Sequence, residues 1–528
     1  MFRSSGTWSS YVSRATLAAC LVPAAGSAAS EDPPGPSPAP VRVAGSENDA
    51  RIERLERLVT TVVEENRRLA EEVRTLKDQL GKATPPLPSP SPPDPAVGAP
   101  AEIEPAIEVE SPATIPSPEP SESAGSVLGI ESSRFRVDYD NGFSIIPEDL
   151  EKTPFSLRVR NQNMFRYNGF DRSERFWTDS AGNRVPIDSS NYFGIPRGRL
   201  IFSGAMLDPD IRYLLSIDYN TVTSNPIGFR AYEFGYRFDR AFELYVGQAK
   251  VLGSREWLES AFAPLQGPDR SMATTFFRPS LSQGVWILGQ PTDHLYYRAM
   301  MSNGFNTLNL QPQSLNNRFA WSGSVWWEPW GSYGRGYADV QNREEAAIRL
   351  GASYVFARGR GSQNDSDAVE NSPVRLSDGT IITVPGAIAP GVTLQTYDIS
   401  LASIDLSYKY RGLGLSTEFY FQDLLAFAGT GPLPIRSTRA LGGFLQGGYF
   451  VIPEKAELYL RGSFVTGAFG SGDELGGGFN WYPLTGRENL RFTFDAARLE
   501  TSPAGQNRTG YVAGQTGLLI RTQVSVFF

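Results

Sequence analysis

The sequence predicts an all-β protein, a transmembrane antiparallel β-barrel of about 16 strands that follows an α-helical coiled coil and a proline-rich linker. Three observations lead to this prediction. The chain ends on a strand with one apolar and one polar face. Its 528 residues contain no apolar run long enough to form a transmembrane helix. From about residue 131 onward, short alternating segments are separated by turn residues.

The final strand, Leu518–Phe528, shows the alternation most clearly. Side chains alternate across a strand, so one face is apolar and the other is polar and basic. The apolar face carries Leu518, Ile520, Thr522, Val524, Val526 and Phe528, and the polar face carries Arg521, Gln523 and Ser525. Such a strand is typical of a barrel whose outer face meets lipid and whose inner face meets water. A half-buried strand of a soluble sheet shows the same pattern, so the rest of the chain has to decide.

The composition agrees with a barrel and excludes other classes. The mean hydropathy is −0.28, which does not exclude a barrel because inward polar residues offset outward apolar ones. Aromatic residues make up 12% of the chain, and there are 52 glycines and one cysteine, as in β-rich envelope proteins. The net charge of −8 argues against a nucleic-acid-binding protein.

Residues 1–29 have the features of a secretory signal peptide. Arg3 and Arg14 supply positive charge, a short apolar stretch follows, and Ser27-Ala28-Ala29 offers a cleavage site. The alternative is lipidation, because the sequence Leu17-Ala18-Ala19-Cys20 resembles a lipobox. With ordinary cleavage the mature chain has no cysteine, and therefore no disulfide or thiol chemistry.

A linker over 30–50 precedes a predicted coiled coil over 51–81. The a positions are Ile52, Val59, Asn66, Val73 and Leu80, and the d positions are Leu55, Val62, Leu69 and Leu76. Apolar residues at flanking positions, Leu58 and Val63, favour a parallel trimer, although a buried Asn66 is also compatible with a dimer.

Residues 82–130 are rich in proline and serine and predict an extended, disordered stalk. At about 3 Å per residue, this stalk separates the coiled coil from the barrel by about 100 Å. Because the chain enters its first strand from the periplasmic side, we expect the stalk in the periplasm, where the coiled coil serves in trimerisation or as a tether to the cell wall.

Residues 131–528 predict the barrel. The predicted strands are 155–167, 195–207, 211–219, 228–239, 241–250, 284–290, 294–302, 318–328, 346–357, 396–410, 413–422, 437–451, 456–464, 473–482, 489–500 and 511–528. Short turns alternate with long loops, as the two rims of an outer-membrane barrel require. One connection, 329–345, is long where a short turn is due. Residues 131–147, with a turn at Asn141-Gly142, predict either a plug or an additional strand pair.

Aromatic residues gather at the strand ends of the short-turn rim, where an interfacial girdle is expected. They are Phe238, Trp326, Trp327, Phe450, Trp481, Tyr482, Phe527 and Phe528.

Several motifs occur in an order that resembles the phosphate-selective porin O and P family over roughly 131–528. They are Phe155-Ser-Leu-Arg-Val159, Ile195-Pro-Arg-Gly-Arg-Leu-Ile-Phe-Ser-Gly204, Arg212-Tyr-Leu-Leu-Ser-Ile-Asp-Tyr-Asn220, Leu244-Tyr-Val-Gly-Gln-Ala-Lys250 and Gly477-Gly-Phe-Asn-Trp-Tyr-Pro483. The resemblance implies a homotrimeric 16-stranded porin whose third loop, here 251–283, folds inward. The family has an adjacent arginine pair before the second strand's apolar run, whereas this chain has Pro196-Arg197, so only Arg197 matches.

Arginine and lysine in the lumen phase of the strands and in the third loop are the candidate pore-constriction residues, because cations in a narrow lumen attract anions. We select Arg158, Arg160, Arg197, Arg199, Arg212, Lys250, Arg255 and Arg270. Carboxylates share the same phase and could cancel this charge, so net anion preference and weak selectivity both remain open. They are Asp218, Glu233, Glu243, Asp405, Glu418, Glu457, Glu474 and Asp495.

No enzyme is predicted. The single histidine, His294, falls in a predicted turn, and one histidine without cysteine forms no His/Cys metal site; we therefore expect no catalytic residues, metal or cofactor. The expected partners are outer-membrane lipids, two further copies of the chain, small anionic solutes and, through the coiled coil, the cell wall. The sequence thus predicts passive diffusion of small hydrophilic solutes, among them anions such as phosphate. The alternative is a structural tether with a plugged barrel.

Overall fold

The computed structural model describes residues 134–139, 142–224, 226–361 and 370–528. The predicted signal peptide, linker, coiled coil and stalk lie outside these residues. Among the helices that the structure describes, none has both the length and the apolar character needed to cross a membrane.

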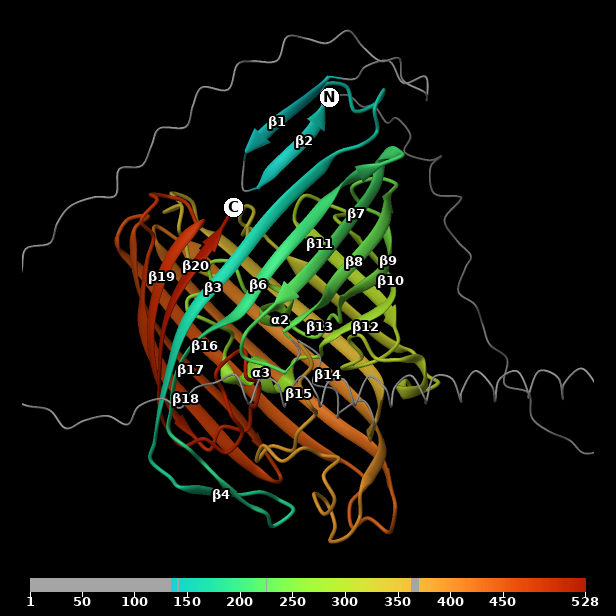
Figure 1. Cartoon of the computed structure of the whole chain (residues 1–528), viewed down its shortest axis with the longest axis vertical. Coiled ribbons are helices and arrows are strands. Elements are labelled where there is room, and N and C mark those ends of the chain that lie inside the picture. The colour runs from blue at the N-terminus through green and yellow to red at the C-terminus, as the bar shows by residue number, and fades with distance from the viewer. Residues whose placement is uncertain (1–133, 140–141, 225, 362–369) are drawn as a thin grey trace, which may run out of the picture. The chain divides into compact units, whose positions relative to one another are not determined.

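Sixteen antiparallel strands form a closed barrel, in which each strand pairs with the next and the last pairs with the first (Figure 1). All sixteen predicted strands are confirmed. They are β3 (Leu157–Arg172), β6 (Ser190–Met206), β7 (Asp208–Tyr219), β8 (Ile227–Arg237), β9 (Glu243–Lys250), β10 (Leu281–Gly289), β11 (Leu295–Ser302), β12 (Ala320–Trp327), β13 (Ala347–Arg360), β14 (Leu394–Tyr410), β15 (Leu413–Gly429), β16 (Thr438–Ile452), β17 (Ala456–Gly467), β18 (Gly470–Trp481), β19 (Leu490–Glu500) and β20 (Gly517–Phe527).

Strand alternation separates an apolar outer wall from a polar lumen. On β17, Leu458 and Leu460 are 54% and 72% exposed on the outer face, whereas the intervening Tyr459 and the following Arg461 are buried inside. On β20 the predicted inward residues Arg521 and Gln523 are fully buried. A closed barrel with this polarity leaves no open sheet edge and presents apolar side chains to lipid. The fold is therefore a membrane-spanning β-barrel of the outer-membrane type.

The predicted aromatic girdle is correct for only some of its members. Phe238, Trp327, Trp481 and Phe528 lie exposed on the outer wall. The prediction is wrong for Phe450, Tyr482 and Phe527, which are buried. Neighbouring residues of a strand point to opposite faces, so adjacent aromatics cannot all reach the lipid interface.

A hairpin precedes the barrel. Strands β1 (Phe135–Tyr139) and β2 (Phe143–Pro147) pair with each other, and β2 also pairs antiparallel with β3. Of the two alternatives for 131–147, the described residues therefore form the additional strand pair. A second small hairpin, β4 (Phe176–Thr178) with β5 (Arg184–Pro186), lies in the first long loop, and a short 3-10 helix, η1 (Pro312–Ser314), lies in the fourth.

The third long loop, 251–280, lies inside the barrel and carries α2 (Arg255–Leu258) and α3 (Met272–Phe277) (Figure 1). Its inward fold was predicted, although residues 281–283 belong to β10. Two wall carboxylates hold the loop. Glu418 accepts hydrogen bonds from the backbone N–H groups of Arg255 and Glu256 at 2.7 and 3.0 Å, and Glu474 accepts from Met272 N at 2.9 Å. They satisfy amides at the starts of the two helices, which have no partner within the helix.

The long connection at the short-turn rim, residues 328–346, also folds into the lumen. Tyr333 and Tyr337 are buried there, and the guanidinium of Arg255 lies 4.6 and 4.5 Å from their ring centres. The carbonyl of Pro264, in the third long loop, accepts hydrogen bonds from the backbone of Tyr337 and Ala338. Two connections from opposite rims therefore meet inside the barrel.

Candidate functional site: a charged layer and a cationic chamber in the lumen

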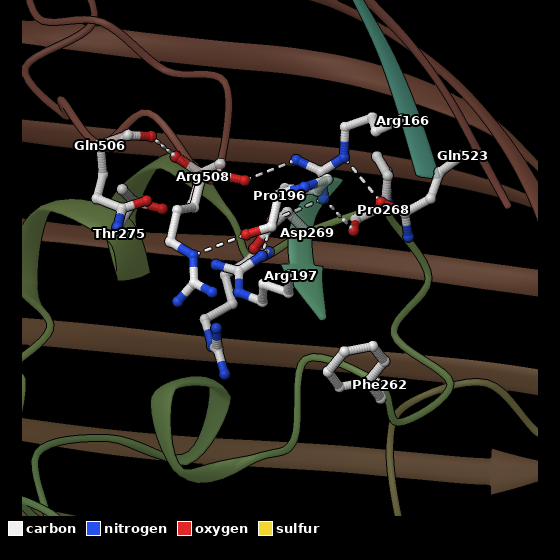
Figure 2. A network of polar contacts seen from close by, with 12 residues as sticks. Arg166, Pro196, Arg197, Phe262, Pro268, Asp269, Thr275, Gln506, Arg508 and Gln523 are labelled. Atoms are coloured by element: carbon white, nitrogen blue, oxygen red, sulfur yellow. Dashed lines mark hydrogen bonds and ion pairs between the residues drawn. The ribbon is translucent and has the colours of Figure 1, made fainter. Parts of the chain in front are cut away.

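A layer of buried ion pairs crosses the lumen, and Asp269 of the third long loop is its first centre. Arg166 on β3 donates to the Asp269 carboxylate at 2.8 Å, and Arg197 on β6 donates to the same carboxylate oxygen (Figure 2). All three side chains are fully buried. Burial alone raises the pKa of Asp269, but the two arginines outweigh it and hold the pKa well below its ordinary value.

Glu370, in the loop between β13 and β14, is the second centre. Its Oε1 accepts from Arg508 Nη1 at 2.8 Å and from Arg197 Nε at 3.4 Å, and its Oε2 accepts from Arg278 Nη1 at 3.2 Å. Burial opposes ionisation, but Arg508, Arg197 and Arg278 keep the pKa of Glu370 well below its ordinary range. This carboxylate is therefore a fixed negative charge surrounded by arginine.

Asp218 on β7 is the third centre. Arg199 on β6 binds it through two hydrogen bonds, of 2.7 and 3.0 Å, and Arg508 and Arg230 approach it at 3.5 and 3.8 Å. The arginine layer thus contains Arg166, Arg197, Arg199, Arg230, Arg278 and Arg508 around Asp218, Asp269 and Glu370. Six guanidinium groups against three carboxylates leave the arginine layer with a formal charge of +3.

A cationic chamber of about 490 Å³ lies on the short-turn side of the arginine layer. Its wall comes from β3, β6, β8, β9, β10 and β11, and the third long loop and the 328–346 connection complete it. The charged residues that line it are Arg160, Arg199, Arg230, Lys250, Arg298, Arg335 and Glu233. Five arginines, one lysine and one glutamate therefore line this space, and two of the arginines, Arg199 and Arg230, also pair with Asp218.

Further cavities lie on either side along the barrel. One of about 690 Å³ is lined by Asn168 and Tyr192, which lie nearer the long-loop rim than the arginine layer. Another of about 590 Å³ opens towards the short-turn rim and shares Arg335 with the cationic chamber. The arginine layer thus lies between the cavity near the long-loop rim and the cationic chamber.

The predicted constriction residues divide among several environments. Arg160, Arg199 and Lys250 line the cationic chamber, and Arg197 and Arg199 belong to the arginine layer. Arg158 donates to the Ser144 hydroxyl of the β1–β2 hairpin at 3.0 Å. Arg212 lies on β7 towards the short-turn rim and is not among the residues that line the chamber.

Arg255 and Arg270, also predicted at the constriction, lie where they hold the inward connections. Arg255 contacts the rings of the 328–346 connection and the hydroxyl of Ser407. Arg270 donates to the carbonyls of Glu256 and Glu259 at 2.9 and 2.8 Å. Both side chains are buried and neither lines the cationic chamber.

One tryptophan links the third long loop to this charge. The side chains of Lys250, Arg270 and Arg278 lie 4.9, 5.1 and 5.1 Å from the ring centre of Trp257. Lys250 also donates to the Trp257 carbonyl at 2.6 Å. An aromatic face attracts cations, so Trp257 stabilises three positive charges that would otherwise repel one another.

Arg230 is in the chamber because of a β-bulge. Ser216 of β7 pairs with Ala231, whereas the next residue, Ile217, pairs with Phe229 and leaves Arg230 unpaired. The extra residue reverses the alternation, so Phe229 is exposed on the outer wall while Ala231 is buried. Strict alternation of side chains along the strand therefore does not place Arg230 on the lumen face.

Arg298, Arg335 and Arg508 were also not selected from the sequence. Arg298 lies on β11 and lines the chamber. Arg335 lies in the connection over 328–346, whose unusual length was the only signal. Arg508 lies between β19 and β20, in a segment without strand periodicity, and its Nε donates to Pro196 O at 2.7 Å (Figure 2).

Comparisons with known proteins give distant similarities only. No family model and no curated protein matches the sequence. OmpT of Vibrio cholerae is 12% identical with a TM-score of 0.43, over 71% of this chain and 98% of that chain. The anion-selective porin from Comamonas acidovorans is 12% identical with a TM-score of 0.43, over 70% of this chain and 99% of that chain. OprB of Pseudomonas putida is 10% identical with a TM-score of 0.44, over 70% of this chain and 94% of that chain.

The barrel assignment rests on the strand pairing itself. Membership of the phosphate-selective porin O and P family remains a prediction from the motifs.

Proposed function

We propose that this protein is an outer-membrane porin for passive diffusion of small hydrophilic solutes, with a preference for anions. The observation that supports this proposal is the cationic chamber, whose lining contains five arginines and one lysine but a single glutamate. In a narrow lumen with low-dielectric walls, such a surplus lowers the barrier for anions and raises it for cations.

Asp218 compensates part of this surplus through Arg199 and Arg230. Several other wall carboxylates hold the third long loop instead of lining the chamber. Glu418 and Glu474 accept from backbone amides of α2 and α3, and Glu457 accepts from the Gln266 side chain at 3.3 Å. The loop therefore lies against the acidic side of the lumen, and the cationic chamber lies on its other side.

Small oxyanions, phosphate among them, are the proposed solutes. Guanidinium groups present planar sets of donors that suit phosphate and carboxylate oxygens. Because only Arg197 matches the arginine pair of the phosphate-selective porins, the proposal covers carboxylates as well as phosphate.

We further propose a homotrimer in which the predicted coiled coil over 51–81 supports assembly and the N-terminal stalk reaches the cell wall. An in-vitro folded OmpT from Vibrio cholerae is described as a trimer form. Native mass measurement of the full chain tests the trimer. Deletion of 30–126 with unchanged attachment to the cell wall would contradict the tether.

A plugged, non-conducting anchor is the second candidate. The observation that favours it is the burial of most of the arginine layer: the side chains of Arg166, Arg197, Arg278 and Arg508 are fully buried. Connections from both rims also fill much of the lumen.

Planar-bilayer recording of the purified full chain separates the two candidates. Under a KCl gradient, an anion porin gives stepwise conductance with a reversal potential on the chloride side. A reversal potential on the potassium side would leave a porin but reject anion preference. A folded barrel, confirmed by a gel shift on heating, that never conducts would favour the anchor.

A further inference from the structure

The carboxylate of Glu370 is bound as a free anion would be bound. Its three arginine partners come from three separate parts of the chain: β6, the end of the third long loop, and the connection between β19 and β20. Both carboxylate oxygens accept hydrogen bonds, and Arg278 Nη2 reaches the main-chain carbonyl of Glu370 at 3.3 Å. Charge-assisted bonds of this kind are the usual means of binding carboxylate and phosphate groups.

We propose that Arg197, Arg278 and Arg508 form an oxyanion-binding site in the pore, and that Glu370 fills it as a tethered internal anion which a permeating carboxylate or phosphate displaces. The site itself stands on the geometry. Its effect on transport rests on the proposed anion porin.

The arginines offer more hydrogen bonds than Glu370 accepts. Arg197 Nη2 and Arg278 Nε are buried without a hydrogen-bond acceptor among the described residues, as are the nearby Arg230 Nε and Arg270 Nη1. A carboxylate has two oxygens, and both are already used. A phosphate has more oxygens for the same donors, so the unused donors favour a tetrahedral oxyanion.

The position of Glu370 is consistent with displacement. It lies in the connection between β13 and β14 and not on a barrel strand, so its side chain can leave the arginines without breaking the wall. Conduction requires that a binding site also release its solute. A competing internal anion lowers the apparent affinity for the solute in the way that any competing state does.

The first experiment compares Glu370→Gln with the wild-type full chain in planar bilayers, with inorganic phosphate added as a blocker of chloride current. The variant keeps the shape of the side chain and removes its charge. We expect the phosphate concentration for half block to fall about tenfold, because the internal competitor is lost. An unchanged concentration in a conducting variant would overturn the proposal.

Asp378→Asn is the matched control. Asp378 is a buried carboxylate of the same connection, but it accepts from the hydroxyls of Ser180 and Thr380 at 2.6 Å each. We expect the phosphate concentration for half block of the chloride current to be the same in this variant as in the wild type. An equal shift in both variants would mean that loosening of the connection, and not the arginine site, causes the effect.

The second experiment does not depend on conduction. Glu370→Ala leaves the three arginines without the carboxylate, so added phosphate or acetate should raise the thermal unfolding temperature in a saturable way at constant ionic strength. The wild type should not respond at these concentrations, because Glu370 already fills the site.

A response to phosphate alone or to acetate alone identifies the solute class, and either supports the site. No response to either anion overturns it. If the wild-type barrel proves not to conduct, the porin proposal fails, and this second experiment still decides whether the site exists.

Discussion

The two halves of the lumen wall differ in how arginine is partnered. On the half formed by β17–β20, each arginine of two prominent pairs faces a carboxylate on the next strand: Arg461 binds Glu474 at 2.8 Å, and Arg521 binds Asp495 at 2.6 Å. On the half formed by β6–β11, Arg298 and Lys250 face other cations across the chamber, and Glu233 is the one carboxylate in its lining. Arginine is thus paired locally in these two cases on one half, whereas on the other half Arg199 pairs with Asp218 but the basic residues of the chamber lining still outnumber the acids.

This difference indicates that the strand register, the docking of the third long loop and the distribution of acids along the wall together decide where charge accumulates in the lumen. Cross-strand register sets Arg461 opposite Gly476 and places Glu474 one pleat away, within reach on the same face. On the chamber side, the arginines lie where neighbouring strands supply few acids. Substitutions on each half of the lumen wall test this difference.

The largest expected effect is on the paired half. Arg461→Met removes the positive charge that is paired with the buried carboxylate of Glu474. We expect it to lower the free energy of unfolding by about 3–5 kcal/mol. The double variant Arg461→Met with Glu474→Gln should recover much of this loss. Urea unfolding of the detergent-solubilised barrel measures both. A double variant as unstable as the single one would mean that Arg461 acts mainly through its hydrogen bond to Asp269 O at 2.9 Å.

The next effect concerns the acids that hold the third long loop. Glu418→Ala removes the acceptor for the amides of Arg255 and Glu256, and leaving these buried donors unpaired costs about 1–3 kcal/mol each. We expect faster protease cleavage within 251–280 and a larger conductance. Thr417→Ala, on the outer face of the same strand, serves as control. Equal cleavage rates in wild type and Glu418→Ala would show that the acidic wall does not hold the loop.

On the cationic half, Arg298→Glu changes the chamber by two charges. We expect the chloride-to-potassium permeability ratio to fall about tenfold, which corresponds to about 1.4 kcal/mol for an ion passing close to the altered charge. The reversal potential under a KCl gradient measures the ratio. The control is Arg439→Glu, at an exposed pair on the outer wall, which should leave the ratio unchanged. A ratio that changes equally in both would remove the chamber as the origin of selectivity.

The smallest effect is the pH dependence of Asp269, whose pKa in the folded protein lies well below its ordinary value. A lowered pKa means that the ionised carboxylate stabilises the fold above the unfolded pKa of about 4, and that this contribution is lost as the pH falls further. The stability difference between wild type and Asp269→Asn should therefore be constant from pH 7 to about pH 5 and shrink below about pH 4. Thermal unfolding across this range measures it. A difference that already shrinks at pH 6 would contradict the lowered pKa.

Much of the barrel could be predicted from the sequence because its signal is local. Alternation along each strand predicted all sixteen strands and placed Arg160 and Arg199 inside. The spacing of short and long connections predicted the two rims, and it marked 329–345 as exceptional. The resemblance predicted the inward fold of the third long loop.

The candidate site was less predictable because its partners are far apart in the sequence. Glu370 meets Arg197 and Arg508 across 173 and 138 residues, and no periodicity relates these positions. Arg230 depends on a bulge that sequence alternation does not reveal. The sequence left open whether the wall acids cancel the arginines; Asp218 does pair with Arg199, whereas Glu418 accepts hydrogen bonds from backbone amides of the third long loop.

The carbonyl of Pro264 joins a connection from one rim to a connection from the other, through hydrogen bonds of 3.0 and 3.1 Å to Tyr337 and Ala338. A cross-brace of this kind makes the two ends of the barrel a single mechanical unit. A solute that displaces the third long loop inside the lumen would therefore strain the connection at the short-turn rim as well, without any change in the wall between them.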